Sequence, residues 1–114
     1  MKNTNKDCVF CKIANKEKSD DMVYQDDKLF AIKDINPKAP VHLLIIPKMH
    51  IASVKEMEPE KGELVSEMIF LAKRLAEEKN LEGYKLLFNV GRSGGQVVDH
   101  LHLHLLSGRP TELP

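Results

Sequence analysis

The sequence predicts an α+β fold in which a five-stranded antiparallel sheet packs against one long helix and one or two short ones. Five short stretches are rich in leucine and branched side chains, one long stretch repeats apolar residues every three to four positions, and tight turns separate neighbouring strands. A chain of 114 residues can bury roughly two thirds of its unfolded surface. We therefore expect a single domain over residues 1–114, with residues 1–6 as a flexible tail.

The first part of the chain predicts a short helix followed by two strands. The segment VFCKIA (9–14) fits the helix. Residues 22–25 and 29–32 fit two strands, and the pair Asp26 and Asp27 between them is typical of a tight turn.

A third strand and the long helix come next. The run VHLLII (41–46) lies between Pro40 and Pro47 and is typical of a buried strand that proline ends. The helix is expected over residues 59–80, because proline suits a first helical turn and one face is apolar. That face contains Leu64, Met68, Leu71, Ala72 and Leu75.

The last two strands are expected at YKLLFNV (84–90) and VVDHLHLHLL (97–106). Between them lies the glycine-rich turn GRSGGQ (91–96). Its glycines would let backbone N–H groups approach a phosphate without a Cβ in the way, although glycines in a hairpin are first of all turn formers.

Composition excludes several classes of partner. Lys plus Arg and Asp plus Glu both number 17, so no overall field attracts nucleic acid or an anionic membrane. The N-terminus has no apolar signal-peptide run, and the longest apolar stretch is too short to span a bilayer. We expect a cytoplasmic protein that binds neither nucleic acid nor membrane. In the cytoplasm two cysteines spaced C-x-x-C are reduced thiols or metal ligands rather than a disulfide.

Three histidines alternate with leucines at residues 100–106, in the run HLHLHLL. On a strand that rises about 3.3 Å per residue, the histidines share one face at roughly 6.6 Å intervals and the leucines face the core. Three alternatives follow: a solvated polar face, ligands of one metal, or divided chemical roles. The outer two histidines would be about 13 Å apart, so at most two of the three could converge on one ion.

This run matches the pattern His-φ-His-φ-His-φ-φ, where φ is apolar, and resembles the histidine triad (HIT) family, in particular its HINT branch. Residues 34–51 (DINPKAPVHLLIIPKMHI) resemble that family's first nucleotide-binding segment, and 89–96 (NVGRSGGQ) resemble its phosphate loop. The likeness is continuous from about Asp7 to Pro110. It implies a hydrolase or transferase acting on the α-phosphate of purine nucleoside phosphoramidates or related nucleoside monophosphate derivatives.

The resemblance implies a catalytic set of four histidines. His102 would attack phosphorus and form a covalent nucleotidyl intermediate, because neutral imidazole is a good nucleophile near pH 7. A backbone carbonyl would hold the proton on its other nitrogen. His104 and His42 would stabilise the phosphoryl oxygens, and His100 completes the set as the first triad histidine. His42 could instead be a buried strand residue with a structural hydrogen bond.

The resemblance also implies nucleotide-binding residues. Asp34 would accept from the ribose hydroxyls, although an Asp before Ile-Asn-Pro can equally cap a turn. Phosphate-side residues would be Asn89, Gly95, Gln96 and Val97; many relatives have a hydroxyl side chain at the last of these positions. The apolar slot for the base, which could also be plain core, would be formed by Phe10, Ile13, Ile32, Ile35 and Leu44.

A structural zinc ion is the implied cofactor. Two cysteines and two histidines are a tetrahedral zinc set, and the resemblance selects Cys8, Cys11, His50 and His100. Such a closed site leaves no position for substrate, so zinc would not take part in the chemistry; two buried thiols without metal would look the same in sequence. The resemblance further implies a homodimer, with helix 59–80 as a contact surface. Other possibilities are a dinucleoside polyphosphate hydrolase, a metal-dependent hydrolase and a non-catalytic nucleotide-binding or protein-interaction module.

Overall fold

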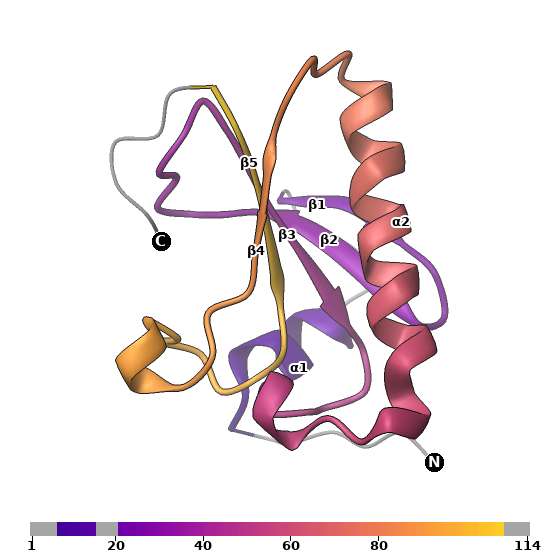
Figure 1. Ribbon diagram of the computed structural model, residues 1–114, viewed down its shortest axis with the longest axis vertical. Helices are drawn as coiled ribbons and strands as arrows, with labels where there is room; N and C mark the ends of the chain where they lie inside the picture. The colour runs from indigo at the N-terminus through magenta and orange to yellow at the C-terminus, as the bar shows by residue number, and fades with distance from the viewer. Residues whose placement is uncertain (1–6, 16–20, 109–114) are drawn as a thin grey trace.

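The computed structural model describes residues 7–15 and 21–108. Its strands form one antiparallel sheet in the order β1-β2-β3-β5-β4, with every neighbouring pair antiparallel (Figure 1). The strands are β1 (Met22–Gln25), β2 (Leu29–Lys33), β3 (Val41–Pro47), β4 (Lys85–Leu87) and β5 (Leu103–Ser107). The predicted fold class is confirmed. The tail expected at residues 1–6 lies outside the described residues.

Within residues 7–15 and 21–108, two α-helices and three short 3-10 helices accompany the sheet. The helix α1 spans Val9–Ala14 and α2 spans Gly62–Glu78. The 3-10 helices are η1 (Val54–Glu56), η2 (Pro59–Lys61) and η3 (Arg92–Gly94). The stretch predicted as one helix from residue 59 therefore begins with a separate 3-10 turn, with proline in its first position. In the part of the chain that the structure describes, no helix combines the length and apolar character needed to cross a membrane.

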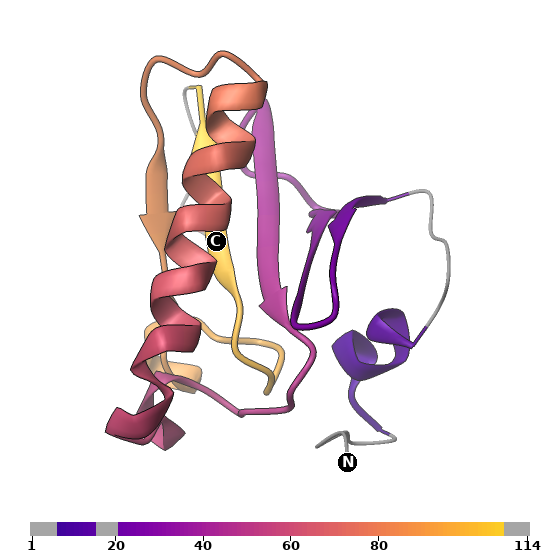
Figure 2. The ribbon, with the colours of Figure 1, turned by 90° about the vertical axis from the view of Figure 1, so that its right-hand side faces the viewer.

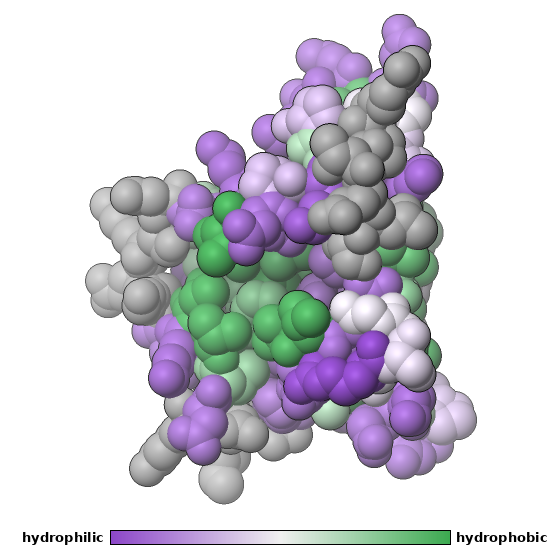
Figure 3. All heavy atoms as spheres, turned by 90° about the vertical axis from the view of Figure 1, so that its left-hand side faces the viewer, coloured by the Kyte–Doolittle hydropathy of each residue, from purple (hydrophilic) through white to green (hydrophobic). Residues whose placement is uncertain are grey.

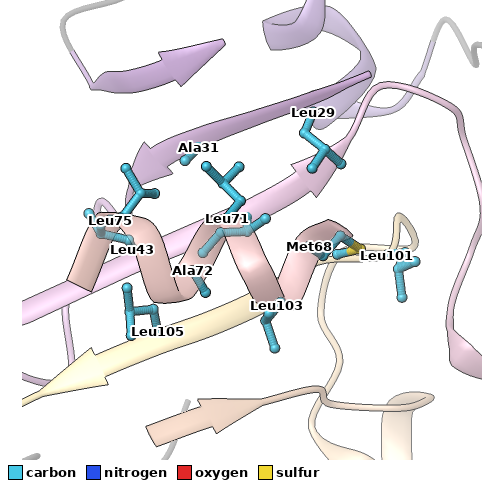
Figure 4. Packing of buried hydrophobic residues seen from close by; sticks show 11 residues of the cluster. Leu29, Ala31, Leu43, Met68, Leu71, Ala72, Leu75, Leu101, Leu103 and Leu105 are labelled. Carbon is cyan, nitrogen blue, oxygen red and sulfur yellow. The ribbon is translucent and has the colours of Figure 1, made fainter. Parts of the chain in front are cut away.

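The main core lies between α2 and one face of the sheet. Figure 2 shows α2 running along this face, and Figure 4 shows its side chains packing on those of β3 and β5. Met68, Leu71 and Leu75 are buried against Leu103 and Leu105. The leucines of the histidine run thus face the core, as predicted.

A second core lies on the opposite face. Alternate residues of β2 and β3 point away from α2 and meet the short helix α1. Phe30 and Ile46 are fully buried there, beside Phe10 of α1. The sheet is therefore covered on both faces, and the histidines that point away from α2 lie in the second layer.

The last strand of the structure is shorter than the strand predicted at 97–106. β5 begins at Leu103, so the strand prediction is wrong for residues 97–102, and His100 and His102 precede the ladder. Pro47 has no N–H to donate, and its carbonyl oxygen lies 2.7 Å from Nε2 of His100. The chain pairs elsewhere instead, with the N–H of Leu101 donating to the carbonyl of Ile51. The strand predicted at 84–90 is also shorter and pairs with β5 only over β4.

Candidate functional site

A cavity of about 400 Å³ opens on the face opposite α2, between α1, the turn after β2 and the glycine loop at residues 91–96. Figure 3 shows this hollow with strongly hydrophobic residues gathered around it. Its size and apolar lining are typical of small-ligand sites. Nine of the ten residues predicted to bind nucleotide line it: Phe10, Ile13, Ile32, Asp34, Ile35, Leu44, Asn89, Gly95 and Val97.

His102 lines this cavity with a defined tautomer. Its Nδ1 atom lies 2.7 Å from the carbonyl oxygen of His100. A carbonyl only accepts hydrogen bonds, so Nδ1 carries the proton and Nε2 keeps its lone pair. Burial lowers the pKa of His102, against an opposing effect of that hydrogen bond and of Asp34. The imidazole is therefore neutral at pH 7 and able to act as a nucleophile.

His42 and His104 form an ordered chain of hydrogen bonds beside it. The backbone N–H of Lys38 donates to Nδ1 of His42 over 3.0 Å, so the proton of neutral His42 is on Nε2. That Nε2 lies 2.9 Å from Nδ1 of His104 and donates to it. The proton of His104 is then on Nε2, which is buried and has no protein partner. His104 therefore offers a donor to a ligand in the cavity.

Burial keeps both of these histidines neutral. It lowers the pKa of His104 to about 3, with smaller contributions in the same direction from His102 and His42. It also lowers the pKa of His42, which Asp34 partly opposes. A neutral His104 can therefore donate a hydrogen bond to a ligand without the cost of burying charge, and a neutral His42 can donate to His104.

Asp34 caps a turn and also lies in the cavity wall. Its Oδ1 accepts from the N–H of Asn36 at 2.8 Å and so caps the turn, while the side chain lines the cavity. Its Oδ2 lies 3.3 Å from Nε2 of His42. Asp34, His42 and His104 come close enough together to suggest a metal site. The proton on Nε2 of His42 argues against metal binding there.

Gln96 is the one predicted nucleotide-binding residue that does not line the cavity. Its buried side chain donates to the carbonyls of Ala52 and Val98 and accepts from the N–H of Gly91. It therefore closes the glycine loop from inside. Gly95 at the loop's end has φ 91°, a left-handed conformation that glycine adopts without strain, and it lines the cavity.

The two cysteines and the remaining two histidines form a second cluster behind the cavity. Sγ of Cys8 lies 3.2 Å from Nδ1 of His100, and Sγ of Cys11 lies 3.3 Å from Nδ1 of His50. The two Nδ1 atoms are 3.1 Å apart. His100 does not line the cavity, and its Nδ1 points into this cluster.

The cluster fits a tetrahedral zinc ion. Bonds of roughly 2.0 to 2.3 Å imply donor atoms about 3.3 to 3.8 Å apart, close to the spacing found here. The Nε2 atom of His100 donates to the Pro47 carbonyl, so its Nδ1 has a lone pair available for metal.

None of the triad histidines shares a cluster with another in residues 7–15 and 21–108, so the single-metal interpretation of the run is not supported. Because all three are buried, they do not form a solvated face either.

Sequence reasoning missed several residues at this site. The cavity wall also contains Val9, Lys33, Asn36, Lys38 and Val98. Lys33 ends β2 and Lys38 lies in the turn after it, and neither position carries a signal of its own in a sequence with many lysines. The role of Lys38 is that of its backbone N–H, which any residue except proline would supply. Arg92 was also missed; it pairs with Asp99 at 2.9 Å and donates to the Gln96 carbonyl across the loop.

Comparison with known proteins gives the family. Residues 7–112 match the family model described as scavenger mRNA decapping enzyme C-term binding, and the solved structures that the chain resembles include HIT proteins. The chain belongs to the histidine triad family, as its sequence predicts. A curated relative is the purine nucleoside phosphoramidase of Escherichia coli K12, 44% identical over 104 residues that cover 90% of this chain and 87% of the relative.

Two solved structures are informative. The HIT family hydrolase of Legionella pneumophila superposes with a TM-score of 0.86 at 47% identity, covering 94% of this chain and 97% of that one. A zinc-bound histidine triad protein of Mycobacterium smegmatis has a TM-score of 0.77 at 31% identity, covering 90% and 76%. The family thus includes a member with bound zinc.

Proposed function

We propose that the protein hydrolyses purine nucleoside phosphoramidates, or related nucleoside monophosphate derivatives, through a covalent nucleotidyl intermediate on His102. Hydrolase activity is supported by the similarity to a purine nucleoside phosphoramidase and a HIT family hydrolase. The observation that carries the proposal is the fixed tautomer of His102, which leaves Nε2 unprotonated in the wall of a nucleotide-sized cavity.

The reaction has two steps. Nε2 of His102 attacks phosphorus, the bond to the leaving amine breaks and the amine takes up a proton from solvent. Water then attacks the same phosphorus and returns one proton to solvent, the phosphorus–Nε2 bond breaks, and the nucleoside monophosphate is released. The Nε2–H of His104 stabilises charge on a phosphoryl oxygen in both steps, with His42 holding it in place. His100 contributes its carbonyl to His102.

The nucleoside would lie against the apolar part of the cavity. Asp34 keeps acceptor capacity for the ribose hydroxyls beyond its turn-capping bond. Asn89 and the backbone of Gly95 face the phosphate side of the same cavity. Phe10 and Leu44 belong to the walls around the base, which recognise shape more than hydrogen-bonding pattern.

The cofactor we propose is a structural zinc ion bound by Cys8, Cys11, His50 and His100. Four protein ligands would fill its coordination sphere, so the ion would tie α1 to the segment before β5 and take no part in the reaction. The support is the spacing and chemistry of the four donors, together with the zinc-bound relative.

We also propose a homodimer through α2 and β4. The strand β4 is at the end of the sheet order, and Leu86 pairs with Leu105 and so lies on the α2 face. Leu86 is exposed, as are Ile69 and Phe70 on α2. An unpaired edge strand beside exposed apolar side chains suits pairing with a second copy.

Mass spectrometry of protein quenched during turnover of an adenosine phosphoramidate tests the catalytic proposal. We expect an adenylyl adduct on the wild type, and neither adduct nor turnover for His102→Ala and His102→Gly. Unchanged turnover in these variants would refute it. AMP binding without turnover of any phosphoramidate or diadenosine polyphosphate would favour a non-catalytic nucleotide-binding module. Hydrolysis of the diadenosine polyphosphate alone would favour a dinucleoside polyphosphate hydrolase. Activity lost in chelator and regained with metal, without a covalent adduct, would favour a metal-dependent hydrolase.

A further inference from the structure

The short helix α1 takes part in two sites at once. Cys8 caps its N-terminus and Cys11 lies within it, and both thiols belong to the proposed zinc cluster. Val9, Phe10 and Ile13 of the same six-residue helix line the proposed nucleotide cavity. Any shift of this helix therefore changes both sites together.

Phe10 directly contacts one residue of each site. Its ring meets the ring of His100 edge-on with centroids 5.8 Å apart, and that of His102 in the same way at 5.1 Å. Phe10 thus contacts both a proposed zinc ligand and the proposed nucleophile. It is buried within the second core, so its position depends on α1 being docked.

The docking of α1 is separable from the rest of the fold. The main core between α2 and the sheet contains no residue of α1, whereas the second core consists of α1 and the opposite face of β2 and β3. A helix of six residues has little stability of its own in water. What fixes it must be its packing on the sheet and the four-donor cluster that Cys8 and Cys11 complete.

We propose that Cys8 and Cys11 are positioning residues for the nucleotide site: by binding zinc together with His50 and His100, they hold α1 as a wall of the cavity and keep Phe10 against His102. This inference rests on the proposed zinc site and nucleotide cavity. Its consequence is that loss of the ion weakens nucleotide binding while the core under α2 stays folded.

Binding of AMP to the full chain tests it, measured by calorimetry on zinc-loaded protein, on chelator-treated protein and after zinc is returned. We expect the Kd for AMP to rise about tenfold or more without zinc and to recover with it, because a pre-formed wall lowers the cost of binding. Amide hydrogen exchange should increase in residues 9–14 and not in residues 62–78. The double variant Cys8→Ser with Cys11→Ser should match the chelated protein.

The variant His50→Ala separates an effect of the ion from one of the helix itself, because His50 is neither on α1 nor in the cavity wall. It should also lose zinc and AMP affinity, whereas Met49→Ala, an exposed neighbour, should not. An unchanged Kd after verified zinc loss, or exchange rising in α2 as much as in α1, would overturn the inference alone. If the wild type takes up no zinc, both this inference and the proposed zinc site are refuted. If zinc-loaded protein binds neither AMP nor GMP, the proposed nucleotide site is refuted.

Discussion

Nε2 of His42 lies 2.9 Å from Nδ1 of His104, and the Lys38 N–H on the far side of His42 fixes which of the two rings donates. The bond runs from His42 to His104, and the only proton left on His104 is the one on Nε2 at the cavity. A backbone N–H on the turn before β3 thereby sets the tautomer of a ring on the neighbouring strand β5. From this relationship we infer that His42 positions His104 rather than donating directly to phosphate.

The first prediction concerns His42→Ala. Without its Nε2–H, His104 is free to adopt the tautomer in which Nε2 lacks the proton, and phosphate loses a donor. We expect kcat to fall about tenfold to a hundredfold with a smaller change in KM, since removing an oxyanion donor outright costs about 10² to 10³. Steady-state kinetics measures the effect. His42→Gln, whose amide can still donate to His104, should lose less; equal activity of wild type and alanine variant would exclude this role.

The second prediction is an acid-sensitive fold. His104 has a pKa of about 3 in the folded protein and near 6.5 when unfolded, so between these values the unfolded state binds more protons. The free energy of unfolding should therefore fall as pH drops below about 6.5, by about 1.4 kcal/mol per pH unit for this one group. Urea unfolding at about pH 7, 6 and 5 measures it. His104→Gln should show a slope shallower by that amount, and identical slopes would contradict the pKa assignment.

The sequence predicted a five-stranded antiparallel sheet and a covering helix, because apolar residues at every second position of a strand and at every third to fourth position of a helix determine which faces are buried. It did not predict the strand order β1-β2-β3-β5-β4. The helix α1 has its predicted limits. The helix α2 begins at Gly62 instead of residue 59 and ends at Glu78 instead of residue 80. The strand over 97–102 could not be excluded in advance. The strand is interrupted because the side chain of His100 donates to the Pro47 carbonyl, which a strand partner would otherwise use.

The same limit applies to the site. The resemblance to the histidine triad family indicated the nine cavity residues and the four-donor cluster, because those roles belong to side chains that its motifs contain. The roles of Lys38 and Gln96 depend on where a backbone N–H or a loop carbonyl lies in space. No local sequence pattern encodes that position.

The third prediction concerns Val97, which is exposed at the cavity and stands where the family resemblance implies a hydroxyl side chain. Val97→Ser would place a hydroxyl donor next to the part of the cavity where we propose that phosphate binds. One added hydrogen bond of about 0.5 to 1.5 kcal/mol in the transition state corresponds to a rise in kcat of about two- to tenfold. Val54→Ser, an exposed valine outside the cavity, is the matched control. If kcat stays the same in both variants, the hydroxyl does not reach the reacting groups.

The fourth prediction concerns the homodimer. Phe70 on α2 is 65% exposed, and a charge at the centre of an apolar contact costs several kcal/mol when buried. Phe70→Glu should convert a dimer into a monomer in sedimentation experiments and leave the thermal unfolding of the monomer nearly unchanged. Val54→Glu adds the same charge elsewhere and should remain dimeric. A wild type that sediments as a monomer at high concentration would disprove the proposed interface.

The last prediction assigns the Gln96 side chain to loop structure rather than ligand contact. Gln96→Ala removes three hydrogen bonds, at 2.7, 2.9 and 2.9 Å, and leaves the Gly91 N–H and the Ala52 carbonyl without these partners. Unsatisfied buried groups cost about 1 to 3 kcal/mol each, so the free energy of unfolding should fall by at least about 1 kcal/mol. Asp99→Ala, which removes the exposed Arg92–Asp99 ion pair beside the same loop and leaves the Arg92–Gln96 hydrogen bond in place, should cost under about 1 kcal/mol.

Gln96→Glu makes the test specific to hydrogen bonding. A glutamate keeps the acceptor for Gly91 but has no donors for the carbonyls of Ala52 and Val98, and it introduces a buried charge. It should therefore destabilise the protein at least as much as alanine does, although it is closer in shape to glutamine. If the glutamate variant instead keeps wild-type stability in urea unfolding, the two carbonyls are satisfied by other groups, and Gln96 is free to face the ligand.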